Sequence, residues 1–210
     1  MEAHSLFVPG WGAPAALYSP GLPDEWRVLE PPSFAASAGS LAAYRHWLRI
    51  ELRNQGRSTL GGHSMGGALA ILAAAEAPEL VERLVLVAPA GLPLDKPIRK
   101  SMRDFVQQLG SGAYPRSVAA SAAAAVARAP RAALALAMEV RRLDLRRECA
   151  RIRAAGIPVS VVGCLTDTLV TCDRTRLLAD LLGGTYDELD SDGGHMWMLS
   201  EHERFAAMLA

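Results

Sequence analysis

The 210-residue sequence has few cysteines, no excess of charge and no long apolar run, and each absence excludes a class of protein. Its three cysteines, Cys149, Cys164 and Cys172, form no CxxC pair and leave an odd thiol, so we do not expect a disulfide framework. No apolar run reaches the roughly 18 residues that a membrane-spanning helix needs. The first residues lack the basic region and long apolar core of a secretory leader. We therefore expect a soluble, cytoplasmic protein.

The net charge is zero, but the charges are unevenly placed. The 22 Lys and Arg residues balance 22 Asp and Glu residues, which is not a composition typical of nucleic-acid binding. Between Lys96 and Arg153 there are 13 basic and 4 acidic residues, so the remainder carries 9 basic and 18 acidic. The five histidines show no paired spacing, and we expect no metal site.

Short apolar segments alternate with longer segments of helical periodicity. Short hydrophobic segments predict six strands at residues 4–8, 27–29, 59–61, 84–87, 157–163 and 185–189. The runs at 84–87 and 159–162 are continuous and apolar, as is typical of buried parallel strands. Apolar residues at three- and four-residue steps, or small apolar runs, predict helices at residues 40–54, 65–77, 174–182 and 201–209. This alternation predicts an α/β fold with a mostly parallel sheet and helices on both faces.

Residues 94–155 interrupt that alternation. The segment is rich in Ala and Arg, with turn signals at residues 110–112 and at Pro130, and we expect it to form two or three helices. The predicted organisation is a core made of residues 1–93 and 156–210 with a helical insertion between them.

One motif carries chemistry. The sequence from Gly62 to Gly66 matches G-x-S-x-G with Ser64 at its centre. An apolar strand precedes it and a small-residue helix follows, which is the setting of a nucleophile elbow, a sharp turn that exposes the serine hydroxyl. The flanking glycines allow the strand and helix backbones to approach closely. The alternative is a glycine-rich turn with an incidental serine.

With this motif and four further segments, the chain resembles the esterase-like branch of the α/β-hydrolase superfamily. The resemblance extends from Leu6 to Leu209. It rests on VPGWG at residues 8–12, the elbow, RLVLVAP at 83–89, PVSVVGCLTDTLV at 158–170 and GGH at 193–195.

A serine hydroxyl is a weak nucleophile and needs a base that an acid orients. The chain order in the superfamily is Ser, then Asp or Glu, then His. The resemblance therefore implies Ser64 as nucleophile, His195 as general base and acid, and Asp167 as the acid that orients it. Three other acids remain alternatives to Asp167, namely Asp173, Asp190 and Asp192.

The resemblance also implies an oxyanion hole, which needs two backbone N–H donors. Met65, directly after the nucleophile, supplies one, and Trp11 in the loop after the first strand supplies the other. Pro9 stands where many relatives carry His, so the hydrogen bonding of this loop must differ from theirs.

A second departure is at the N-terminus. Relatives often have two strands before the oxyanion loop, and this chain has room for one. We therefore expect about six strands rather than eight, with the exposed edge left short or covered by a second subunit, as in a homodimer.

By resemblance, residues 94–155 form a cap that helps to select substrates. We expect Phe105 and Tyr114, together with Trp11 and His63, to contact substrate, although such residues can simply pack the cap onto the core. The basic excess of the segment suggests an anionic substrate or a carrier such as acyl carrier protein or a coenzyme A thioester. The alternative is a solvated, arginine-rich helix.

The implied activity is that of a serine hydrolase that cleaves carboxylic esters or thioesters through an acyl-enzyme, without a cofactor. Perhydrolase, carbon–carbon hydrolase and acyltransferase activities use the same residues and remain alternatives. A ligand-binding protein that keeps the fold without turnover is an alternative of a different class.

Overall fold

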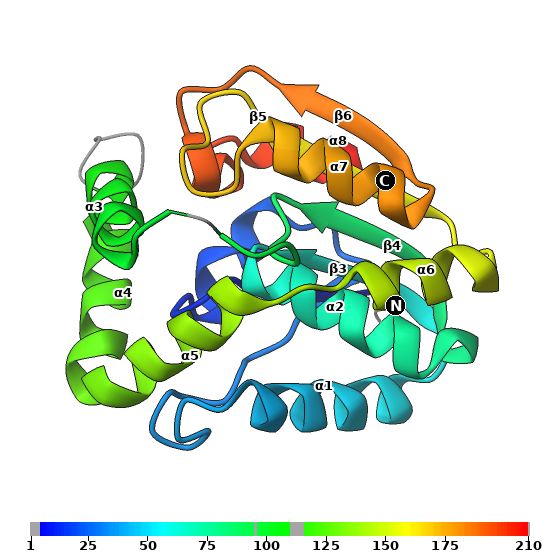
Figure 1. The fold of residues 1–210 in the computed structure, drawn as a ribbon, viewed down its shortest axis with the longest axis horizontal. Coiled ribbons are helices and arrows are strands. Elements are labelled where there is room, and N and C mark those ends of the chain that lie inside the picture. The colour runs from blue at the N-terminus through cyan, green and yellow to red at the C-terminus, as the bar shows by residue number, and fades with distance from the viewer. Residues whose placement is uncertain (1–4, 95, 110–115, 210) are drawn as a thin grey trace.

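The computed structural model describes residues 5–94, 96–109 and 116–209, and its centre is a six-stranded parallel sheet (Figure 1). The strand order is β2-β1-β3-β4-β5-β6, and every neighbouring pair is parallel. The predicted α/β class and strand number are confirmed. The strands are β1 (Ser5–Val8), β2 (Trp26–Val28), β3 (Ser58–His63), β4 (Val81–Val87), β5 (Val159–Cys164) and β6 (Thr185–Leu189).

The four inner strands, β1, β3, β4 and β5, are mostly buried because both faces of the sheet are covered. Successive side chains alternate between the faces. Leu6 and Leu84 enter one buried cluster, whereas their neighbours Phe7 and Val85 enter the other. The edge strand β2 has only three residues, which limits the unpaired backbone exposed at this edge.

The two faces carry unequal helical layers. Helices α1, α2, α6 and α7 share one buried cluster, and α8 packs on the opposite face with the loops of residues 13–22 and 190–200. The α-helices of the described residues are α1 (Leu41–Gln55), α2 (Met65–Glu76), α3 (Ile98–Leu109), α4 (Arg116–Arg128), α5 (Pro130–Arg142), α6 (Arg146–Ala155), α7 (Cys172–Leu182) and α8 (His202–Leu209).

Within residues 94–155 the described part contains four helices, where we expected two or three. Pro130, which we read only as a turn signal, occupies the first position of α5, where a missing N–H costs nothing. The helices α3–α5 lie beyond the carboxyl ends of the strands, whereas α6 packs between α2 and α7 (Figure 1). Burial of Cys149 and Ile152 anchors α6 in that layer.

Several smaller features bear on the site. Cys149, Cys164 and Cys172 are all free thiols. The residues described here contain no helix that is both long and apolar enough to cross a membrane. They also contain no group of three His, Cys, Asp or Glu side chains placed to hold a metal ion.

Candidate active site

Ser64 lies in the sharp turn between β3 and α2. Its backbone has φ 53° and ψ −117°, a conformation that is strained for a residue with a side chain. Surrounding hydrogen bonds hold it there: Ser64 N donates to the Val87 carbonyl at 3.0 Å, and the Ser64 carbonyl accepts from the N–H groups of Ala68 at 3.1 Å and Ala90 at 2.9 Å. Two strands and one helix therefore impose this turn.

Glycines allow the close approach that the turn requires. A Cβ on Gly66 would lie 2.1 Å from the carbonyl oxygen of Val8 and 2.5 Å from that of Pro9. A Cβ on Gly62 would lie 2.5 Å from backbone atoms of Gly66. These distances are shorter than any real Cβ contact, so α2 can begin against the end of β1 only because both positions are glycine.

Ser64, His195 and Asp167 form a continuous hydrogen-bonded chain. Nε2 of His195 is 2.9 Å from Oγ of Ser64, and Nδ1 of His195 is 2.7 Å from Oδ2 of Asp167. The side chains of His195 and Asp167 are 5% and 0% exposed. Because Asp167 holds Nδ1, the opposite ring nitrogen faces the serine hydroxyl, as an acceptor of its proton must.

The carboxylate of Asp167 is itself fixed. Its Oδ1 accepts hydrogen bonds from the backbone N–H groups of Leu169 at 2.7 Å and Val170 at 2.9 Å, which leaves Oδ2 for His195. The other three acids that the sequence left open are all exposed, namely Asp173, Asp190 and Asp192. The structure brings Asp167 and not these residues to His195.

His63 is joined to a buried polar chain beneath the site. The N–H of Gly10 donates to the Tyr18 hydroxyl at 3.1 Å, and that hydroxyl is 2.7 Å from Nδ1 of His63. Nε2 of His63 is 2.8 Å from the carbonyl oxygen of His195. Since a carbonyl only accepts, Nε2 carries the proton, Nδ1 accepts, and Tyr18 donates to it.

This assignment makes His63 neutral. Burial lowers the pKa of His63 well below its usual range, and the neighbouring His195 lowers that pKa further, against the opposing effect of the hydrogen bond to the His195 carbonyl. Burial also raises the pKa of Tyr18, so its hydroxyl keeps its proton. We expected His63 to contact substrate; it lines the cavity beside Ser64, and both of its ring nitrogens are bonded within the protein.

The polar chain explains how the loop after β1 is held despite Pro9. Tyr18 anchors Gly10, the residue directly before the expected donor Trp11. The Trp11 indole is bonded and packed within the protein: its Nε1 donates to the Ala133 carbonyl at 3.2 Å, and its ring lies against Phe105. Met65 is the first residue of α2, so its N–H has no acceptor within the helix. The Trp11 indole N–H is engaged within the protein, so of Trp11 it is the backbone N–H that remains for the expected role as a donor, alongside the N–H of Met65.

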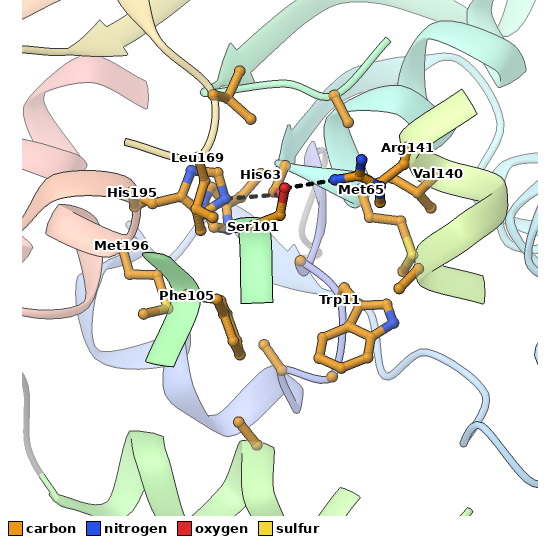
Figure 2. Close-up of a pocket in the computed structure, with 18 of the residues that line it drawn as sticks. Trp11, His63, Met65, Ser101, Phe105, Val140, Arg141, Leu169, His195 and Met196 are labelled. Atoms are coloured by element: carbon orange, nitrogen blue, oxygen red, sulfur yellow. Dashed lines mark hydrogen bonds between the residues drawn. The ribbon is translucent and has the colours of Figure 1, made fainter. Parts of the chain in front are cut away.

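A cavity of about 150 Å³ opens beside Ser64 and His195 and is covered by helices α3, α4 and α5 (Figure 2). Phe105 and Trp11, two of the expected substrate contacts, line it. Tyr114 lies outside the described residues. The remaining walls are mainly apolar and include Met65, Val140, Leu169 and Met196.

Sequence reasoning missed two residues of the site. Tyr18 lies in a loop with no recognisable motif. Gln108, on α3, accepts from the N–H of His195 at 3.1 Å and donates to the Thr168 hydroxyl at 3.0 Å. It thereby joins the loop of Asp167 to the loop of His195. No local pattern in the sequence distinguishes either residue.

The chain is similar to known proteins in its sequence pattern and in its fold. A family model described as the alpha/beta hydrolase family matches residues 6–208. The enol-lactonase from Burkholderia xenovorans has a similar structure, with a TM-score of 0.74 and 18% identity over 100% of this chain and 90% of its own. A thermophilic esterase from Thermogutta terrifontis has a TM-score of 0.69 and 18% identity, over 98% of this chain and 87% of its own. No curated protein matches the sequence.

Proposed function

Because the chain belongs to the alpha/beta hydrolase family, we propose that it is a serine hydrolase that cleaves carboxylic esters or thioesters through an acyl-enzyme. One observation carries the proposal: the hydrogen-bonded chain from Ser64 through His195 to the buried Asp167. The comparisons support the hydrolase fold. The bond that is cleaved is inferred from the site.

The proposed reaction begins with transfer of the Ser64 proton to Nε2 of His195 as Oγ attacks the carbonyl carbon. The resulting oxyanion accepts hydrogen bonds from the backbone N–H groups of Met65 and Trp11. His195 then gives the proton to the departing alcohol or thiol, and the acyl group remains on Ser64. A water molecule, deprotonated by His195, attacks the acyl carbon, and the proton returns to Ser64 as the acid leaves.

The buried acid makes this sequence productive. Asp167 stabilises the imidazolium form of His195 that exists in both transition states, and its fixed orientation keeps Nε2 directed at Ser64. The strained backbone of Ser64 serves the same end, because it projects Oγ out of the turn toward the base.

A fluorophosphonate probe tests the activated serine. We expect an adduct on the wild-type protein, detected by intact mass, and its loss in Ser64→Ala; the exposed Ser117→Ala serves as the matched control. Hydrolysis of 4-nitrophenyl acetate should follow the same pattern. Absence of both labelling and hydrolysis in a folded wild-type protein would refute the proposal and favour a binding protein.

A panel of free esters and coenzyme A thioesters of increasing acyl length then separates the substrate classes. Substrates that the small cavity can hold should be preferred, and kcat/KM should fall steeply once the acyl chain exceeds it. Addition of hydrogen peroxide or an alcohol as acceptor distinguishes hydrolysis from perhydrolysis and acyl transfer.

A further inference from the structure

One charged side chain reaches the otherwise apolar cavity beside Ser64. Among the described residues that line it, Arg141 is the only Lys, Arg, Asp or Glu. It comes from the last turn of α5 and points toward Ser101 of α3, on the opposite side of the view from His195 (Figure 2). The cavity therefore has the nucleophile and base at one side and a single permanent charge at the other.

Among the described residues, the hydrogen-bond partners of Arg141 are all neutral. Nη1 is 2.5 Å from Oγ of Ser101, and Nη2 donates to the carbonyl oxygens of Leu94 and Lys96. Within the described parts of the chain, no carboxylate lies within ion-pair distance of Arg141. Asp104, the acid on α3, is paired with Lys96 at 3.2 Å.

Neutral acceptors satisfy hydrogen bonds but leave the positive charge uncompensated. A charge that faces an apolar cavity loses hydration, and an anion in the cavity restores the balance. A guanidinium has five N–H donors in a planar fork, so the three acceptors present leave donors for a ligand. The Ser101 hydroxyl accepts from Arg141 and keeps its own O–H to donate beside it.

Building on the proposed function, we infer that the substrate carries a carboxylate apart from the ester group, and that Arg141 and Ser101 bind it. One arginine neutralises one negative charge. A carboxylate matches this charge, whereas a phosphate monoester, with a charge of about −1.5 to −2, would leave an excess in an apolar cavity. The site selects a small half-ester of a dicarboxylic acid, or the ester of a short hydroxy acid.

Paired substrates that differ only in charge test this inference. Monomethyl succinate and monomethyl glutarate are compared with their carboxamide counterparts, in which an amide of the same shape replaces the carboxylate. A second pair, acetoxyacetic acid and acetoxyacetamide, places the charge in the alcohol part. At pH 7.5 we expect a kcat/KM preference of about 10- to 100-fold for the carboxylate in at least one pair.

Arg141→Met should remove that preference by lowering kcat/KM for the carboxylate ester alone. Arg142→Met, at the exposed neighbouring position on the same helix, should leave the preference unchanged. Equal losses for the charged and neutral esters in Arg141→Met would mean that Arg141 only ties α5 to residues 94–96, and would overturn the inference. No charge preference in any wild-type pair would overturn it as well.

A binding measurement keeps the test independent of turnover and of the Arg141 variant's folding. By calorimetry, Ser64→Ala should bind monomethyl succinate at least tenfold more tightly than methyl succinamate, and added salt should weaken the binding of the charged ligand. Equal affinities would overturn the inference. Fluorophosphonate labelling of wild-type Ser64 reports separately on the proposed function.

Discussion

The buried polar chain of hydrogen bonds, from the Gly10 N–H through Tyr18 and His63 to the His195 carbonyl, is tested most directly by Tyr18→Phe. The substitution removes one oxygen atom, which accepts from the Gly10 N–H at 3.1 Å and donates to Nδ1 of His63 at 2.7 Å. The aromatic ring, which packs against Phe7 with centroids 5.4 Å apart, is retained. Packing is therefore preserved while two hydrogen bonds are lost.

The magnitude follows from burial. Tyr18 is 1% exposed, and Gly10 and His63, which lose the oxygen as a partner, are also buried. A buried donor or acceptor left without a partner costs about 1–3 kcal/mol. The substitution leaves one of each, at Gly10 and His63, and we expect the free energy of unfolding to fall by about 2–4 kcal/mol.

Catalysis should fall as well, because Gly10 directly precedes the expected oxyanion donor Trp11. Loss of an oxyanion-hole donor costs about 10²–10³ in kcat, and a donor that is displaced rather than removed should cost about tenfold. The loss should appear in kcat more than in KM, since this hydrogen bond strengthens in the transition state.

Urea unfolding and the kinetics of ester hydrolysis measure the two effects. Tyr44→Phe is the control: the Tyr44 hydroxyl donates to the Pro32 carbonyl at 2.7 Å, and Tyr44 does not line the cavity beside Ser64. That variant should lose about 1 kcal/mol and keep its kcat. A loss of less than about 0.5 kcal/mol in Tyr18→Phe, with kcat unchanged, would refute the view that this chain holds the loop.

Two further predictions concern His63 and Gly66. The folded state keeps His63 neutral below its usual pKa, whereas the unfolded chain takes up a proton there. The contribution of neutral His63 to the free energy of unfolding should therefore be fully present above about pH 6.5 and fall at lower pH by up to about 1.4 kcal/mol per pH unit. Urea unfolding between pH 7.5 and 5 measures this fall, and the free energy of unfolding should depend less steeply on pH in His63→Gln. Gly66→Ala puts a Cβ 2.1 Å from the Val8 carbonyl oxygen and should lower the free energy of unfolding by more than about 3 kcal/mol. Gly156→Ala is the control: the added Cβ meets open space, and the left-handed backbone should cost about 1–2 kcal/mol. Equal shifts of the thermal unfolding midpoint in the two variants would contradict this account.

Sequence patterns located the sheet because buried parallel strands are continuous apolar runs. The predicted strand at 84–87 is such a run and lies within β4 (Val81–Val87), with all four residues buried. The predicted strand at 185–189 coincides with β6 although that strand is polar and mostly exposed. Assignment of α6 to one of the two layers could not be predicted. Its arginine-rich sequence is typical of a surface helix, and only the packing of Cys149 and Ile152 shows which layer it joins.

The candidate site also contains residues that the sequence predicts and residues that it does not. Ser64 lies in a local motif whose glycines have a steric purpose, and His195 and Asp167 follow late strands in the order that the resemblance implies. Tyr18 and Gln108 act through single hydrogen bonds to residues far away in the chain. Such contacts depend on how the loops and α3 pack, and an isolated Tyr or Gln carries no signal for them.

The basic residues between Lys96 and Arg153 differ in where the structure places them. The sequence counts 13 basic residues between Lys96 and Arg153 as equal. The arginines of α6 are exposed, as are others such as Arg128 and Arg142. These side chains face solvent, where salt screens their charges over about 8–10 Å. Among the described residues, Arg141 is the one Lys or Arg that lines the cavity beside Ser64, and its partners there are neutral. A substrate preference set by charge should therefore disappear with this one side chain and persist when its exposed neighbours are neutralised.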